Sequence, residues 1–258
     1  MPNASDALAS AYLPSFPMLG PMPPPSEHFY SRERLISAIG LSLRSPGLMC
    51  VIHGVGDVGK TLTAVQYSHN KQQDYDAVFW LQLDTAPGLA DAFMQMVALL
   101  GLSTGADDHG QAIAKGRNGL RETDKRWLLV FDNAHGLYDI SRYFRQTMQE
   151  TNGSVIITTH HENIISEAPH VTKVQIDLLG QRAGSEMLLK YLGRDVRNDP
   201  ERQLAMEVSA NVGGLPVAIA AGSCWHKVEQ KTSITQTPCG KRLLKYWTVC
   251  YHWTCHRS

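Results

Sequence analysis

Short apolar runs alternate with segments of helical periodicity through much of the chain. Four continuous runs are typical of buried parallel strands, at residues 48–52, 77–83, 127–131 and 154–159. Helical patterns are predicted over residues 31–39, 61–69, 89–100, 184–192 and 201–210, the first beginning with a Ser31 cap. Alternation of this kind predicts an α/β fold, with a parallel sheet between two layers of helices and the start of a small helical subdomain after it.

The two ends of the chain lack such periodicity. Residues 1–28 contain seven prolines, which predicts a disordered, Pro-rich leader. Residues 224–258 hold four of the five cysteines, an uneven distribution that does not indicate a disulfide framework. We interpret them as an atypical tail of unknown structure. The domains predicted between these ends are residues 29–175 and residues 176–223.

The charge balance gives no indication of a polyanionic partner. Lys and Arg together number 24, as do Asp and Glu, so we expect neither nucleic acid nor an anionic membrane as partner. No apolar run approaches the roughly 20 residues that span a bilayer. The chain has no Lys or Arg before Arg32 and therefore no signal-peptide n-region, so we expect a cytoplasmic location.

One glycine-rich segment carries a specific chemical signal. Residues 54–61 match the pattern G-x-x-x-x-G-K-[ST] at every fixed position, after an apolar run and before a helix. Glycines in such a loop let successive N–H groups point at phosphate oxygens, and the following helix presents its N-terminus to the same anion. The lysine reaches the terminal phosphates, and the threonine hydroxyl is a ligand for Mg²⁺. The predicted nucleotide-binding residues here are Gly54, Val55, Gly56, Asp57, Val58, Gly59, Lys60 and Thr61. The predicted domain 29–175 is therefore a P-loop nucleotide-binding domain.

A metal-side carboxylate is expected at the end of a neighbouring strand. Asp132 directly follows the apolar run 127–131 and suits this catalytic and metal-binding role together with Thr61. The next residue is Asn133, and an amide cannot accept a proton from an attacking water. The sequence therefore predicts slow or absent hydrolysis.

Six motifs in chain order resemble the NB-ARC family of signalling ATPases, also called STAND. They are FYSRE at 29–33, the P-loop, YDAVFW at 75–80, WLLVFDN at 127–133, GSVIITTH at 153–160 and GGLPVA at 213–218. The resemblance covers about residues 27–223. Two positions depart from the family pattern, where Ser31 replaces a glycine and His160 replaces an arginine.

The resemblance implies further nucleotide-binding residues. It implies that Pro216 touches the adenine ring, that Arg32 lies near the nucleotide, and that His160 stands in the position of a γ-phosphate sensor. An imidazole is shorter than a guanidinium and only partly charged at neutral pH, so this sensor would be weaker. A helix-start turn at Pro216, a surface arginine and a strand-end histidine are the alternative interpretations.

The resemblance also implies a function. ADP would hold the domain closed and ATP with Mg²⁺ would favour an assembling state, with further copies of the chain or other signalling proteins as partners in a defence response. The family's winged-helix subdomain is expected after residue 223, and no Met-His-Asp motif follows there, so we expect a truncated or misread gene end. The alternative is an active P-loop ATPase or a small-molecule kinase.

Overall fold

The computed structural model describes residues 18–19, 22–26, 29–83, 88–102, 108–134, 151–163, 170–193 and 199–222. The predicted tail at 224–258 and most of the predicted leader lie outside the described residues. The chain divides into two compact units. The first contains the described residues up to Gly56 and from Lys60 to Ile176, and the second contains Asp57–Gly59 and the described residues from Asp177 onward.

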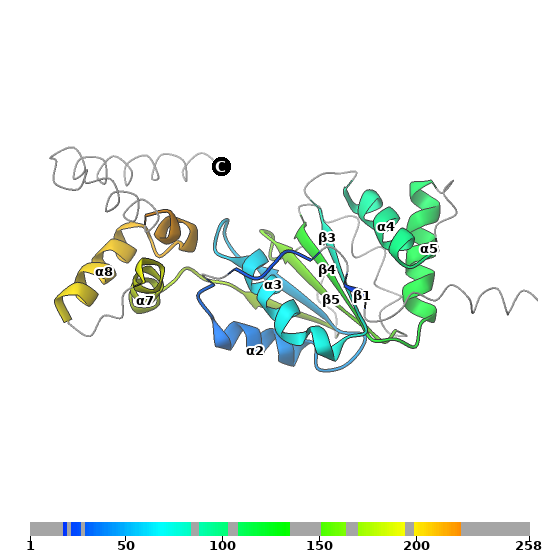
Figure 1. The fold of residues 1–258 in the computed structure, drawn as a ribbon, viewed down its shortest axis with the longest axis horizontal. Helices are drawn as coiled ribbons and strands as arrows, with labels where there is room; N and C mark the ends of the chain where they lie inside the picture. Colours follow the sequence, from blue (N-terminus) through cyan, green and yellow to red (C-terminus); the bar gives the residue numbers. More distant parts are fainter. Residues whose placement is uncertain are drawn as a thin grey trace, which may run out of the picture. The chain divides into compact units, whose positions relative to one another are not determined.

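A six-stranded parallel sheet organises the first unit (Figure 1). Its strands are β1 (Met18–Leu19), β2 (Met49–His53), β3 (Ala77–Gln82), β4 (Trp127–Ala134), β5 (Gly153–Thr159) and β6 (Val171–Gln175). Their order is β1-β3-β4-β5-β2-β6, and every neighbouring pair is parallel. Strands β2 and β5 are buried along their whole length, as continuous apolar runs in a doubly covered sheet require.

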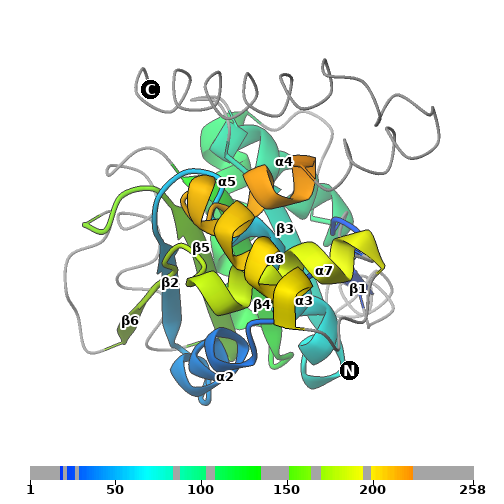
Figure 2. The same ribbon diagram turned by 90° about the vertical axis from the view of Figure 1, so that its left-hand side faces the viewer.

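Helices cover both faces of this sheet, so the predicted three-layer α/β/α fold is confirmed (Figure 2). One face carries α2 (Glu33–Ser42) and α3 (Lys60–Lys71), which is followed by the 3₁₀ turn η2 (Gln72–Asp74). The other face carries α4 (Gly88–Leu99) and α5 (His109–Glu122). Side chains of α4 and α5, such as Phe93 and Leu120, pack with Phe79 and Trp127 of the sheet in one buried apolar cluster. On the α2–α3 face, burial raises the pKa of the Cys50 thiol to about 12, which keeps it protonated beside Ser42.

Two elements of this unit carry too little apolar pattern to be predicted. Helix α5 is rich in glycine and charged residues, and it begins with a capping box in which Asp108 and Gln111 exchange hydrogen bonds. Gly116 faces α4 so closely that a Cβ there would lie 2.6 Å from Met96 Cε. Strand β6 pairs with β2 and is only partly buried. Polar residues are tolerated in β6 because it lies at the edge of the sheet and partly faces solvent. They are tolerated in α5 because the outer side of that helix faces solvent.

Two local features mark the start of the chain. Strand β1, which lies within the predicted leader, pairs with Ala77 and Val78 at the edge of the sheet, and disorder of the leader as a whole stays a prediction. The backbone groups of an edge strand accept any extended segment, and Met18–Leu19 offers one between flanking prolines. Helix α2 has Arg32 rather than Ser31 at its N-cap, with no side-chain cap, because the Ser31 hydroxyl donates to Glu33 Oε1 instead.

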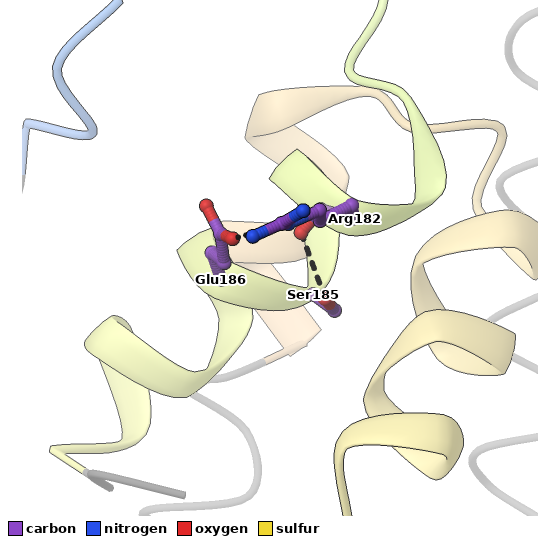
Figure 3. A network of polar contacts seen from close by, with 3 residues as sticks. All are labelled: Arg182, Ser185 and Glu186. Carbon is purple, nitrogen blue, oxygen red and sulfur yellow. Dashed lines mark hydrogen bonds and ion pairs between the residues drawn. The ribbon is translucent and has the colours of Figure 1, made fainter. Parts of the chain in front are cut away.

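The second unit is helical. It contains α7 (Gln181–Leu192), α8 (Asp199–Asn211) and a helical segment at residues 216–222. Helices α7 and α8 approach closely at Gly184, where an added Cβ would lie 1.8 Å from Ser209 Oγ. Figure 3 shows polar contacts within α7, where Arg182 pairs with Glu186 at 3.1 Å on the exposed side and the hydroxyl of the buried Ser185 donates to the Arg182 carbonyl. An exposed pair of this kind contributes little stability, so the close approach at Gly184 is the stronger constraint on the helix pair.

Substitution of two glycines is predicted to change stability in opposite directions. A Cβ at Gly153 would lie 2.0 Å from the buried Trp127 ring, whose Nε1 donates to the Leu120 carbonyl. Gly153→Ala is therefore expected to lower the free energy of unfolding by about 1–3 kcal/mol. Gly40→Ala lies within α2, its Cβ would make an ordinary 3.8 Å contact with Tyr67, and it is expected to raise stability by about 0.5–1 kcal/mol. Urea denaturation followed by circular dichroism measures both, and equal effects of the two variants would contradict the packing described here.

Candidate nucleotide and magnesium site

The predicted P-loop connects the C-terminal end of β2 to the first residue of α3. Since β2 is an interior strand of the sheet, the loop lies where several strand ends converge. Its backbone takes left-handed conformations at Asp57, with φ 58°, and at Gly59, with φ 98°. A Cβ added at Gly59 would meet nothing within 4 Å, so the space beside this residue is open. The helix that begins at Lys60 turns its N-terminal N–H groups toward the loop, which is the arrangement that binds phosphate.

Lys60 is held against the P-loop by backbone carbonyls of the loop itself. Its side chain is buried, and Nζ donates to the Gly54 carbonyl at 3.0 Å and to the Val55 carbonyl at 2.8 Å. Val58 is also buried, whereas Val55 and Asp57 are exposed. The ammonium charge is thus kept beside the loop backbone, where a bound phosphate would need it.

Asp132 and Thr61 meet, although 71 residues separate them. The Thr61 hydroxyl donates to Asp132 Oδ1 at 2.7 Å, and the Thr158 hydroxyl donates to the same oxygen at 2.6 Å. Asp132 is only 5 % exposed, so these hydroxyls stabilise a carboxylate that is largely removed from water. Thr61 and Asp132 therefore lie in contact, their shared metal role stays a prediction, and Thr158 is a third member of this group that the sequence pattern does not reveal.

Strand β4 is irregular beside this carboxylate. The strand was predicted to end at Phe131, but it continues to Ala134 with a shift of register against β5 between these two residues. Asn133 takes a left-handed conformation, with φ 61°, and its N–H donates to the Thr158 hydroxyl at 2.9 Å. Regular alternation from Leu128 through Val130 puts Asp132 on the face of the sheet that α3 covers, and the irregularity begins only at the next residue.

His160 follows β5 and lies against the P-loop. A Cβ added at Gly56 would be 3.4 Å from His160 Cε1, so the imidazole occupies the space beside this glycine. The histidine is exposed, in contrast to the buried Thr158 and Thr159 before it. The contact places an ionisable group beside the loop that would hold phosphate.

The structure places the two remaining predicted residues at helix starts. Arg32 is the N-cap of α2, where its carbonyl accepts hydrogen bonds from the N–H groups of Leu35 and Ile36. Pro216 is buried and is the first residue of the helical segment at 216–222 in the second unit. The fixed φ of a proline suits this first helical position. Roles of Arg32 and Pro216 toward a nucleotide stay predictions.

The residues present fit a nucleotide phosphate with Mg²⁺. A hydroxyl oxygen and a carboxylate oxygen converge at Thr61 and Asp132, and such hard oxygen donors are the ligands that Mg²⁺ accepts, with phosphate completing its coordination. Lys60 and the open loop at Gly59 supply the positive charge and the backbone donors for the phosphate. No cluster of three or more His, Cys, Asp or Glu side chains suited to a metal occurs among the described residues.

Comparison with protein families decides the relationship. The model of the NB-ARC domain matches residues 32–196, well over half of the chain. The chain belongs to the NB-ARC family. Its α/β unit is therefore a nucleotide-binding P-loop module, and the matched range includes the P-loop, Asp132, Thr158 and His160.

The NB-ARC chain is similar to parts of longer curated proteins. It is 26 % identical over 175 residues to a disease resistance protein of Arabidopsis thaliana. This match covers 65 % of this chain and 18 % of that protein. It is 26 % identical over 203 residues to the regulatory protein AfsR of Streptomyces griseus, covering 74 % of this chain and 20 % of that protein. The chain thus spans about one fifth of the length of these two relatives.

Solved structures share the α/β fold of this chain. A STAND protein with a tetratricopeptide repeat sensor from Pyrococcus horikoshii superposes with a TM-score of 0.54 at 18 % identity, over 79 % of this chain and 31 % of that one. A Walker-type ATPase from Pyrococcus abyssi gives 0.54 at 13 % identity, over 78 % and 69 %. At these identities the likeness establishes the fold alone. None of the described helices is both long enough and apolar enough to cross a bilayer.

Proposed function

We propose that this NB-ARC chain is a nucleotide-dependent signalling switch that binds ADP or ATP with Mg²⁺ and hydrolyses ATP slowly or not at all. The observation that carries the proposal is the convergence of Thr61 and Asp132 beside the P-loop. Bound Mg²⁺ would neutralise phosphate charge in a site of this kind. Thr61 and Asp132 would hold it, while Lys60 and the loop N–H groups would bind and orient the phosphates.

Slow turnover follows from the residue beside the carboxylate. Asn133 occupies the position after Asp132, and its amide cannot take a proton from water. Its backbone N–H is already bonded to Thr158, and its left-handed conformation is fixed by the irregularity of β4. Among the described residues of this strand, no second carboxylate follows Asp132 as a general base. A site with these properties would hydrolyse bound ATP slowly, and an active ATPase or kinase is the competing function.

The output of the switch is proposed by analogy with the family. Its relatives include a disease resistance protein and a regulatory protein, which supports a role in defence signalling. Partners would be further copies of the chain or other signalling proteins. A switch requires that ADP and ATP make different contacts, because a ligand shifts a conformational equilibrium only by its differential affinity for the two states.

Loss of the Lys60 ammonium is predicted to abolish nucleotide retention. Purified wild-type protein, when denatured, is expected to release about one ADP per chain. Lys60→Ala should release almost none, because loss of charge-assisted hydrogen bonds worth about 1.5–3 kcal/mol lowers affinity roughly 10–100-fold. Lys71→Ala is the matched control, since Lys71 lies on the same helix but is exposed and pairs only with Asp74 at the surface in the contacts described.

Phosphate release distinguishes the two functions. The switch predicts at most about one phosphate per chain from added ATP over the time of a purification. Sustained release over many turnovers, lost in Lys60→Ala, would replace the switch by an ATPase. Absence of nucleotide from both proteins, together with no binding of added ADP, would remove the proposed function altogether.

His160 is proposed to contact the γ-phosphate, which its position against Gly56 supports. An arginine is longer and permanently charged, so His160→Arg is predicted to raise the affinity for ATP relative to ADP by about 5–10-fold, which is less than a full charge-assisted hydrogen bond because the imidazole already supplies part of the contact. Titration with fluorescent ATP and ADP analogues measures the ratio. His161→Arg adds the same charge one residue further along an exposed segment and should leave the ratio near the wild-type value. An equal effect of the two arginines would mean that general charge, and not a γ-phosphate contact, is responsible.

A further inference from the structure

Thr158 makes two hydrogen bonds that together join the metal carboxylate to its backbone. Its hydroxyl donates to Asp132 Oδ1 at 2.6 Å and accepts from the Asn133 N–H at 2.9 Å. A hydroxyl has one proton to donate, so that proton is committed to the carboxylate. Thr158 is 1 % exposed, and it therefore contacts neither solvent nor, directly, a nucleotide in the open loop.

The position of β5 in the sheet explains why this residue can act at a distance from the P-loop. Strand β2, which leads into the P-loop, and strand β4, which carries Asp132, are not neighbours, because β5 lies between them. Asp132 must therefore extend across the end of β5 to reach Thr61. Thr158 stands on that intervening strand, and its side chain is on the same face as the carboxylate that it bonds.

The irregular segment of β4 needs the same hydroxyl. Between Phe131 and Ala134 the register of β4 against β5 shifts, and the regular ladder is interrupted at Asn133. An N–H that leaves the regular ladder needs another acceptor, and the Thr158 hydroxyl supplies it to Asn133. One side chain thus fixes both the backbone turn that follows Asp132 and the direction of its carboxylate.

We propose that Thr158 is a positioning residue for Mg²⁺ binding, holding the Asp132 carboxylate in the orientation that the metal requires. The proposal rests on the proposed function, since it assigns a role within the same nucleotide site. Thr61 alone would leave the carboxylate bonded only to a residue of the P-loop, which must also serve the metal. The bond from Thr158 comes from the rigid sheet and persists whatever the loop binds. Positioning of this kind acts on metal affinity and leaves the phosphate contacts of Lys60 and the loop N–H groups untouched.

The test compares nucleotide binding with and without Mg²⁺ in the full chain. Thr158→Val keeps the volume but removes the hydroxyl, and Thr158→Ser keeps the hydroxyl. A fluorescent ADP analogue is titrated in EDTA and then at increasing Mg²⁺. Thr158→Val is expected to need about tenfold or more Mg²⁺ for half-maximal effect, the usual cost of removing a group that orients a metal ligand. Its affinity for ADP in EDTA should match the wild type, and Thr158→Ser should restore the Mg²⁺ response.

Thr159→Val serves as the matched control, because the Thr159 hydroxyl is equally buried but bonds the Ala134 carbonyl and the His161 N–H and not Asp132. It should keep the wild-type Mg²⁺ response. If Thr158→Val does not fold, Thr158→Ala, compared with Thr158→Ser, tests the same loss of the hydroxyl. An unchanged Mg²⁺ response in folded Thr158→Val or Thr158→Ala, or an equal loss of ADP affinity in EDTA, would overturn the proposal while the nucleotide site stands. Failure of the wild type to bind ADP in either buffer would overturn both.

Discussion

The hydrogen bond between Thr61 and Asp132 is the interaction on which the site depends. It joins the first turn of α3 to the end of β4, across the end of the intervening strand β5. The two residues meet because β4, β5 and β2 are parallel neighbours in this order, so that their C-terminal ends lie at one edge of the sheet. Burial of Asp132 strengthens the constraint, because a carboxylate that is largely removed from water needs hydrogen-bond donors in fixed positions.

The rest of the unit supports this edge. Apolar residues on both faces hold β2, β4 and β5 in register, and the contact of Gly153 with Trp127 fixes the start of the β4–β5 pair. The same pair becomes irregular only at its other end, where Asn133 leaves the regular conformation and Thr158 takes over its N–H. The regular pairing of β4 with β5 thus supports the irregular end of β4. Because the rest of the strand is held rigidly, Asn133 can depart from the regular conformation and still stay in one position.

The sequence predicted the features that a short pattern or a continuous apolar run encodes. The P-loop has fixed residue types at fixed spacing, and the interior strands are apolar throughout, so both were placed correctly, and Thr61 and Asp132 are in contact as a shared metal site would require. Helix α5 and strand β6 were missed because glycine, polar residues and partial exposure remove the apolar period. Thr158 was missed for a different reason. A threonine in a β-branched run has the same pattern whether its hydroxyl bonds a carboxylate or not, and only the register between strands brings it to Asp132.

Binding of Mn²⁺, a spectroscopic substitute for Mg²⁺, tests the metal site at Thr61 and Asp132 most directly. Electron paramagnetic resonance counts the free Mn²⁺ during a titration of the ADP-bound protein. The account predicts about one bound Mn²⁺ per chain in the wild type. For Asp132→Asn, it predicts loss of about tenfold or more in Mn²⁺ affinity with ADP still bound, because an amide replaces a charged oxygen ligand. Equal Mn²⁺ affinity in the two proteins would contradict it and place the metal away from the carboxylate.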